Sequence, residues 1–482
     1  MLLLPLLIPI VGAAVLLTFG ANGRARQLAL VIGGMEIVSV LRVVLAIYFS
    51  GPVQFGRFLR ADGLSAFFLL NIALVSGLVL VYSLDYLRHV EGERFSSARW
   101  FYAFLFFFLF TMIGVCLSSN LGLLWIMMEA TTLASALLVG FYNTKGAVEA
   151  GWKYLIVCTV GIAFALFGTI VLYLAAIQSG LPPDAALDWK NLMEASARLG
   201  SQIALVKLSF VFVVVGYGTK VGLVPMHSWL PDAHAEAPSP ISALLSAVLL
   251  NCAMYTLLRY DAIVSRAIGS NFSHTLLLGF GVLSLVTAGL LIVVQRDLKR
   301  LLAYSSIEHM GIVAIGVGLG GSLGLYGALL HTFNHSLGKT LLFFAAGNVR
   351  QNFGTLRMDR IGGLARTLPK TALALSLGSL AIVGLPPFSL FVSEFAILSE
   401  AFAQSRVWVA TLFLVTLSVV FGGMLFHLSG MFFRETKRSP AAAHMALSEA
   451  VPIALAALGL AWFGVHIPSA FKEMIDRAIA VL

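Results

Sequence analysis

The segment FVFVVVGYGTKVGLVP, residues 210–225, places one lysine in an apolar stretch and ends with a glycine and a proline. A charged side chain at the centre of a bilayer costs roughly 2.5–3.5 kcal/mol, so Lys220 predicts a functional site. The glycine and proline are expected to break the helix directly after it. The segment VGLPP, residues 383–387, repeats this break and is followed by Glu394. Paired breaks of this kind indicate an ion site in a transporter.

The composition predicts an all-α integral membrane protein. Hydrophobic residues make up 59% of the 482 residues and charged residues only 11%, whereas soluble domains carry about 25% charged residues. The first apolar run has no basic segment or cleavage site and is expected to be a retained helix. About fourteen apolar runs are long enough to cross a bilayer, near 1–20, 27–49, 64–84, 100–118, 120–140, 151–177, 203–224, 240–260, 273–294, 300–319, 323–347, 371–395, 405–430 and 448–468.

The net charge of +9 reflects membrane topology. If the loop carrying Arg24 and Arg26 is cytoplasmic and the later loops alternate, Lys and Arg are about twice as frequent on the cytoplasmic side as on the other. This bias places both termini on the opposite side. The basic balance therefore does not predict nucleic-acid binding.

The repeated break predicts two related cores. They are expected at 100–260 and 273–430, preceded by three leading transmembrane helices in 1–99 and followed by a cytoplasmic loop and a final transmembrane helix in 431–482. An odd number of five helices per core would insert the two copies with opposite topology, as inverted repeats do.

The chain is expected to bind no cofactor or metal of its own. Cys116, Cys158 and Cys252 all fall in predicted spans without C-x-x-C spacing, and an iron–sulfur cluster generally needs four thiolates. His331 and His335 have the i,i+4 spacing found in some zinc sites but lack a supporting carboxylate motif. Redox chemistry is therefore assigned to partner subunits.

Glu129 lies near the middle of a predicted span. Desolvation would force a lone carboxylate there to be neutral unless a cation approaches it. At an effective dielectric constant near 20, unit charges about 4 Å apart attract by about 4 kcal/mol. Movement of Glu129 relative to Lys220 would therefore switch the lysine between holding and releasing a proton. The alternative is a static ion pair that orients two helices.

A second set of titratable residues occurs in the later core. His331, His335 and Lys339 recur every four residues and form one polar stripe on a helix face, with Gly338 suggesting a local irregularity. Histidine titrates near neutral pH and suits a proton shuttle. Together with Glu394 on a broken helix, the stripe favours a relay over packing.

Other charged residues leave two interpretations open. Glu308 and His309 could pass protons between the cores or form a structural cap and ion pair. Lys207, at the edge of a span, can reach the interface with its ammonium group or join the relay. Glu36 and Arg42 could face partners or pair locally.

The stretch PMHSWLPDAHAEAPSPISALLS, residues 225–246, resembles the signature of the antiporter-like subunits shared by complex I, Mrp cation/proton antiporters and membrane-bound hydrogenases. DGLS at 62–65, DLKRLLAYS at 297–305 and GLPP at 384–387 add to the resemblance, which covers roughly 60–430. It implies fourteen helices, two inverted five-helix repeats with broken helices, and a water-filled chain of ionisable residues.

The resemblance also assigns roles to residues of this chain. The family's paired glutamate and lysine match Glu129 and Lys220, and its twelfth-helix terminal site matches Glu394. The polar face of its central helix matches His331, His335 and Lys339. Further relay candidates are His227, His234, Asn251, Glu308, His309 and Lys207.

One position departs from the family pattern. Asn251 stands where antiporter and complex I members usually carry lysine, and an amide cannot carry the proton. The link between the cores would then run through water, histidines or Glu308. Asn251 together with YSSIEHM at 304–310 resembles component F of hydrogenase 4, among the group 4 nickel–iron hydrogenases.

The resemblance implies a proton-translocating membrane subunit of a complex I-related oxidoreductase, most similar to a membrane-bound hydrogenase or formate hydrogenlyase assembly. It would sit in a bacterial or archaeal cell membrane, among other membrane subunits and lipid, below a peripheral redox arm that carries iron–sulfur clusters and nickel–iron. The alternatives are a cation/proton antiporter subunit of Mrp type, an NADH-quinone oxidoreductase subunit, or a membrane anchor that does not pump.

Overall fold

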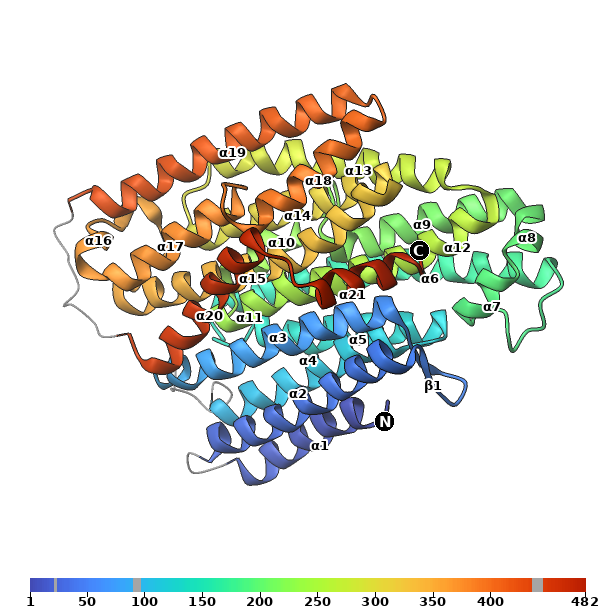
Figure 1. Ribbon diagram of the computed structural model, residues 1–482. Coiled ribbons are helices and arrows are strands. Elements are labelled where there is room, and N and C mark those ends of the chain that lie inside the picture. Colours follow the sequence, from blue (N-terminus) through green and yellow to red (C-terminus); the bar gives the residue numbers. More distant parts are fainter. Residues whose placement is uncertain (21–23, 90–96, 436–444) are drawn as a thin grey trace.

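The computed structural model describes residues 1–20, 24–89, 97–435 and 445–482. Most of the described chain is helical, and the long helices run side by side (Figure 1). Part of the cytoplasmic loop expected within 431–482 falls outside the described residues. The two termini lie toward the same end of the bundle as the short strands (Figure 1).

The leading helices run from one edge of the bundle into its interior. They are α1 (Leu4–Phe19), α2 (Ala25–Ser50) and α3 (Gly63–Tyr86), with β1 (Val53–Phe55) and β2 (Leu59–Ala61) forming an antiparallel hairpin between α2 and α3. The Asp62 carboxylate caps α3, because its Oδ1 accepts a hydrogen bond from the Ser65 amide at 3.0 Å.

The next part of the chain contains the first break. Its elements are η1 (Leu87–His89), α4 (Ala98–Leu117), α5 (Leu121–Val139), α6 (Lys145–Gln178), α7 (Trp189–Glu194), α8 (Ser196–Leu199), η2 (Gly200–Gln202), α9 (Ile203–Val221), α10 (Trp229–Glu236), α11 (Ser239–Leu244), η3 (Leu245–Leu249) and α12 (Leu250–Ile268). The segment η3 is a π-helical turn, which joins α11 to α12 in one continuous path.

The later part contains the second break. Its elements are α13 (Ser270–Val293), α14 (Leu298–Leu319), α15 (Gly321–Phe353), η4 (Met358–Arg360), α16 (Leu364–Thr367), α17 (Pro369–Ile382), α18 (Ser389–Ala403), α19 (Val407–Phe433), α20 (Leu447–Val465) and α21 (Ser469–Ile479). The prediction of a local irregularity at Gly338 is wrong, because α15 continues through this residue without interruption. The irregular turn lies in η3, which packs against α15.

The prediction of an all-α membrane protein is confirmed. Within the described residues, 11 helical segments are long and apolar enough to cross a membrane, and α1 and α17 are shorter apolar helices. The total of fourteen spans stays a prediction. Exposed apolar side chains, such as Phe49 and Phe426, provide the apolar outer surface that helices facing lipid require.

Both predicted breaks are confirmed. Helix α9 ends at Val221, and Gly222 follows with φ +83°. Helix α17 ends at Ile382, and Gly384 follows with φ +69°. Only glycine adopts this left-handed region without strain, so each glycine allows the chain to leave one helix and begin the next.

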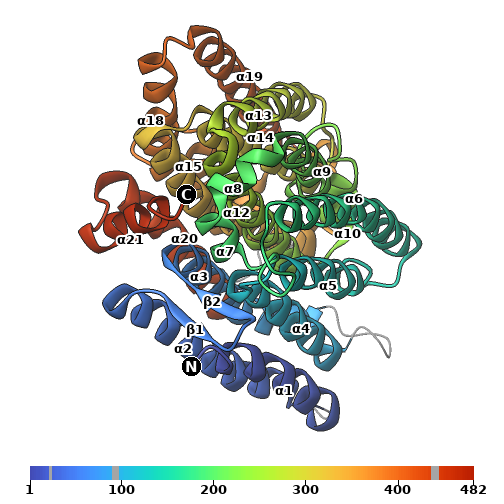
Figure 2. The same cartoon turned by 90° about the vertical axis from the view of Figure 1, so that its right-hand side faces the viewer.

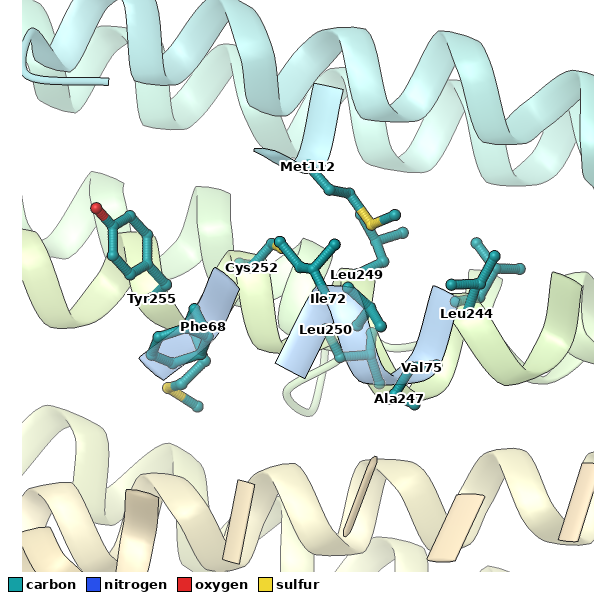
Figure 3. Packing of buried hydrophobic residues seen from close by; sticks show 14 of the residues in the cluster. Phe68, Ile72, Val75, Met112, Leu244, Ala247, Leu249, Leu250, Cys252 and Tyr255 are labelled. Atoms are coloured by element: carbon teal, nitrogen blue, oxygen red, sulfur yellow. The ribbon is translucent and has the colours of Figure 1, made fainter. Parts of the chain in front are cut away.

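The interior layer holds the ionisable residues. Figure 2 shows α1 and α2 at one edge, α19 at the other, and α3, α12 and α15 between them. Side chains from α3, α4 and the α11–η3–α12 segment, among them Ile72, Met112 and Leu249, meet in a dense apolar layer (Figure 3). Polar groups in this interior are removed from water and depend on one another.

Candidate functional site

Lys220 lies in the last turn of α9, directly before the break. Its side chain is fully buried. The Nζ atom donates hydrogen bonds to Thr131 Oγ1 at 3.1 Å and to the Tyr154 hydroxyl oxygen at 3.0 Å. A buried ammonium group is costly unless its protons are hydrogen-bonded. Two hydroxyls from α5 and α6 therefore stabilise a proton on this lysine.

The hydroxyls around Lys220 form a directed chain. Thr131 donates its own proton to the Met128 carbonyl at 2.6 Å, and Ser135 donates to the Thr131 carbonyl at 2.5 Å. The 2.7 Å contact between the Ser135 and Tyr154 oxygens therefore has Tyr154 as its donor. Tyr154 accepts from Lys220 and donates onward to Ser135. Tyr154 was not among the predicted site residues, although a tyrosine within an apolar span can indicate a buried hydrogen-bonding group.

Glu129 belongs to a neighbouring network. It is half-buried on α5, where its Oε1 accepts a hydrogen bond from Thr159 at 2.8 Å and its Oε2 accepts one from Thr132 at 3.2 Å. Among the described residues, no ion pair within 4.0 Å joins it to Lys220, although the two charges interact electrostatically. The structure therefore shows the glutamate and lysine separated, each held by its own hydroxyls.

A neutral polar cluster lies where α3, α12 and α15 meet. The Ser336 hydroxyl oxygen accepts hydrogen bonds from Asn71 Nδ2 and Asn251 Nδ2, each at 2.8 Å, and its proton goes to the Ala247 carbonyl at 2.7 Å. Asn251 Nδ2 also donates to the Ala247 carbonyl at 2.7 Å. The π-helical turn η3 supplies this carbonyl. Asn251 is therefore fixed by short hydrogen bonds, and Asn71 is a partner that the sequence analysis missed.

Lys339 is the buried cation of the later core. Its Nζ donates a hydrogen bond to the Leu302 carbonyl at 2.9 Å, and its side chain is fully buried. Glu308, on the neighbouring helix α14, is 1% exposed and interacts electrostatically with it. Neither carboxylate oxygen of Glu308 has a hydrogen-bond partner among the described residues. A proton on Glu308 or a cation beside it would reduce this unfavourable burial.

Two histidines from adjacent helices are directly hydrogen-bonded. His309 Nδ1 lies 2.9 Å from His331 Nε2, and His331 Nδ1 lies 3.0 Å from Ser393 Oγ. Because the Ser393 hydroxyl donates to the Leu390 carbonyl at 2.8 Å, it accepts from His331 Nδ1. His331 therefore carries its proton on Nδ1, and its Nε2 accepts from His309.

The remaining histidines of this region extend the polar interior. The ring of His335 lies 5.3 Å from that of His309, and the ring of His234 stacks on Phe343 at 5.0 Å. Neither His335 nor His234 has a hydrogen-bonded ring nitrogen among the described residues. Sites of this kind are where water or a moving proton is expected to be accommodated.

Glu394 lies in α18, beyond the second break, and is 3% exposed. One oxygen atom or nitrogen atom from each of His309, His331 and Glu394 lies within 4.8 Å of the others. The Oε1 atom of Glu394 has no hydrogen-bond partner among the described residues. The structure thus joins the expected terminal glutamate to the histidine pair.

Two relay candidates lie apart from these groups. Lys207 is exposed on α9, and its Nζ lies 5.2 Å from the centroid of the Phe272 ring. This position matches a lysine that reaches the interface. His227 is partly buried in the loop after the first break, with its ring 6.2 Å from that of Tyr304.

A buried ion pair joins the start of α3 to the middle of α12. Arg259 donates to both oxygens of Asp62, at 2.5 Å and 2.7 Å, and its guanidinium lies 4.2 Å from the centroid of the Trp189 ring. Burial by itself raises the pKa of Asp62, but the Arg259 charge and hydrogen bonds lower it below its usual value. Arg259 lies inside α12 and is fully buried, and it was not among the predicted site residues.

Two sequence models of known families match the chain. The model described as "NADH:quinone oxidoreductase/Mrp antiporter, TM" matches residues 118–422, and "NADH-Ubiquinone oxidoreductase (complex I), chain 5 N-terminus" matches residues 50–96. A hydrogenase-4 component F homolog from Methylacidiphilum infernorum is 42% identical over 79% of this chain and 80% of the relative. Hydrogenase-4 component B from Escherichia coli is 33% identical over 76% of this chain and 54% of the relative.

Solved structures share the fold over nearly the whole chain. A chain of the archaeal membrane-bound sulfane sulfur reductase superposes with a TM-score of 0.88 at 24% identity, covering 100% of this chain and 97% of that chain. A chain of the Mrp complex from Dietzia sp. superposes with a TM-score of 0.87 at 19% identity, covering 99% and 96%. Both solved chains are subunits of multi-subunit complexes.

Proposed function

The chain belongs to the family of NADH:quinone oxidoreductase and Mrp antiporter membrane subunits, and we propose that it translocates protons within a complex I-related oxidoreductase. The observation that carries the proposal is the set of buried ionisable side chains Lys220, Glu308, Lys339 and Glu394. Of these, Lys220 and Glu308 lie on helices that are long and apolar enough to cross a membrane. Ionisable groups at that depth are expensive and mark ion pathways. A role in proton movement explains why each of these costly groups is present in the interior.

In the first core, Lys220 is the group that holds and releases the proton. Its two hydroxyl partners stabilise the ammonium form. The Tyr154 hydroxyl in turn donates a hydrogen bond to Ser135. Glu129 accepts a hydrogen bond from Thr159, at an exposed position on the surface of the helices. Its approach to about 4 Å would stabilise the charged lysine by about 4 kcal/mol. The separated geometry is therefore the state from which Lys220 gives up its proton more readily.

In the later core, Lys339 exchanges protons with groups that lead toward Glu394. Glu308 supplies the opposite charge, and ring contacts link His335 to His309 and His309 to His331. A neutral imidazole carries both a donor and an acceptor, so the pair can pass a proton from ring to ring. Glu394, beside the pair, is the terminal acceptor.

We place the redox chemistry in partner subunits. Two relatives of this chain are named as hydrogenase-4 components, which supports a group 4 membrane-bound nickel–iron hydrogenase or a formate hydrogenlyase-like complex in a bacterial or archaeal cell membrane. Iron–sulfur clusters and the nickel–iron centre would belong to its peripheral arm. This chain would bind no cofactor and would convert the conformational work of that arm into ion movement.

A second candidate, a membrane anchor that does not pump, draws on one observation. Asn251 and Asn71 form a neutral cluster with Ser336 between the two cores, and amides do not carry a charge across it. In that case each buried lysine would keep the hydrogen bonds that it has in this structure. Proton movement measured with and without these lysines separates the two candidates.

The redox half of the proposal is tested by purifying the chain from its native membranes in mild detergent and identifying what accompanies it. A partner with two C-x-x-C pairs suited to nickel–iron ligation, together with iron–sulfur subunits, is the expected result. Flavin- and NADH-binding subunits would replace the hydrogenase assignment with respiratory complex I. Only small hydrophobic partners would favour an Mrp-type antiporter and overturn the redox assignment.

A further inference from the structure

Three potential metal ligands converge from three helices in the later core. His309 comes from α14, His331 from α15 and Glu394 from α18, and one ligand atom from each lies within 4.8 Å of the others. All three are nearly or fully buried. The sequence pattern paired His331 with His335 instead, because only residues on one helix can be recognised by spacing.

His331 is already arranged as a metal ligand. Its Nδ1 proton is held by the Ser393 hydroxyl, which is itself fixed by the Leu390 carbonyl. Histidines that bind metals almost always donate their second ring proton to such a partner, and this fixes the ring and its tautomer. The Nε2 lone pair of His331 is therefore free of a proton and faces His309 Nδ1.

The other two ligands need only small changes. His309 Nδ1 lies 2.9 Å from His331 Nε2. The Nε2 atom of His309 has no hydrogen-bond partner among the described residues, and moving the His309 proton to it makes both facing nitrogens acceptors without changing the charge. Zn–N distances of about 2.0–2.1 Å in a tetrahedral site place ligand atoms about 3.3–3.5 Å apart. The ligand oxygen of Glu394 lies within 4.8 Å of a nitrogen of each histidine, so a shift of at most about 1.5 Å brings it into that range. Its Oε1 atom has no hydrogen-bond partner among the described residues.

The local charges suit a divalent cation. Glu394 and Glu308 interact with one another as two buried carboxylates, and both carry oxygens without hydrogen-bond partners among the described residues. A dication would balance both of them when Lys339 is neutral. Two imidazoles and a carboxylate are ligands that Zn²⁺ and Co²⁺ accept readily.

The site lies one layer beneath the surface. Gly384 in the second break lies directly against the Glu394 carboxylate, since a Cβ at that glycine would collide with it. The next residue of the break, Leu385, is 37% exposed. The loop of the second break therefore lies between the Glu394 carboxylate and the outer surface of the chain.

We propose that His309, His331 and Glu394 form a binding site for one divalent transition-metal ion of the Zn²⁺ class. The site is defined by its ligands and does not depend on proton transport. If the proposed function also holds, an occupied site withdraws a histidine pair and the terminal glutamate from the proton path, so that the ion acts as an inhibitor.

Metal binding is measured on the intact complex in detergent by equilibrium dialysis against Zn²⁺ and by zinc-edge X-ray absorption. The variants His331→Asn and Glu394→Gln each remove a ligand. His335→Asn is the matched control, because it lies one turn from His331 and outside the set of three. Ser393→Ala removes the hydroxyl that accepts the Nδ1 proton of His331 and is expected to weaken binding about 10–100-fold.

The wild type and His335→Asn are expected to bind one tight zinc ion more than His331→Asn and Glu394→Gln, with two imidazole nitrogens at about 2.0–2.1 Å. Equal zinc content in all four proteins, or a spectrum without paired imidazoles, overturns the site. Elution as an intact complex on size exclusion verifies that the variants fold. Because no proton flux enters these readouts, a failed metal site leaves the proposed function standing, and a failed proton assay leaves the metal site standing.

Discussion

The Nζ atom of Lys220 lies 3.0 Å from the hydroxyl oxygen of Tyr154. This contact joins the end of α9, just before the first break, to the first third of α6. It makes a tyrosine in an apolar helix one of two acceptors for a buried ammonium group. The hydroxyl also donates a hydrogen bond to Ser135. The Tyr154 oxygen therefore stabilises the proton on Lys220 and also connects it to the next hydroxyl of the chain.

Replacing Tyr154 with phenylalanine is expected to slow proton translocation about tenfold. The substitution removes one of two hydrogen bonds to a buried charge, which contribute about 1.5–3 kcal/mol each, and about 1.4 kcal/mol corresponds to a factor of ten in rate. Proton uptake by reconstituted vesicles measures the effect. Tyr173→Phe on the same helix is the control, and equal loss in both variants would remove the special role of Tyr154.

Glu129→Gln is expected to lower proton translocation at least about tenfold while changing the free energy of unfolding by less than about 0.5 kcal/mol. The amide keeps an oxygen for Thr159 but loses the charge that stabilises Lys220 on approach. Glu149→Gln removes an exposed carboxylate that pairs with Lys153 at 2.7 Å and serves as the control. Full activity of Glu129→Gln would mean that the half-buried carboxylate has no part in proton movement.

Asn251→Leu is expected to lower the stability of the protein by about 1–3 kcal/mol, because it leaves buried polar groups of the neutral cluster without partners. Ser336 would lose one donor, and the Ala247 carbonyl would lose another. The midpoint of thermal unfolding in detergent measures the loss. A midpoint unchanged from that of the wild type would show that the cluster does not hold α12 against α15.

Asp62→Asn is expected to destabilise the protein by about 3–5 kcal/mol near neutral pH, because Arg259 stays buried without its counter-charge. The folded-state pKa of Asp62 is lowered, so the stability that its charge provides is present above the unfolded value, about 3.9. It is lost as the pH falls through the lower folded value. The unfolding midpoints of wild type and variant should therefore converge in acid.

A gap between wild type and Asp62→Asn that stays constant from neutral to strongly acidic pH would contradict this account of the ion pair. Arg259→Lys provides a comparison, since lysine keeps the charge but not the two parallel hydrogen bonds. Its unfolding midpoint is expected between those of the wild type and Asp62→Asn.

Features set by local chemistry were predictable from the sequence. The helix breaks follow from Gly222 and Gly384, whose backbone conformations suit glycine, and the burial of Lys220 follows from the apolar residues around it. These signals lie within a few residues of the feature that they predict. The same reasoning failed at Gly338, because α15 is held straight by helices packed on every side.

Contacts between distant helices could not be predicted. The acceptor role of Tyr154, the pairing of Arg259 with Asp62 and the meeting of His309 with His331 all depend on how helices pack. The spacing of His331 and His335 placed them on one face but did not show that only His331 bonds to a second histidine. The sequence identified most of the ionisable groups but not their partners.

The central claim, that buried lysines carry protons through this chain, is tested most directly by the number of protons moved per electron in the reconstituted complex. Lys220→Ala and Lys339→Ala are compared with Lys207→Ala, which removes an exposed lysine from the same helix as Lys220. The account predicts a reduced ratio in the first two variants and the wild-type ratio in the third. A wild-type ratio in both Lys220→Ala and Lys339→Ala would contradict it and favour the anchor.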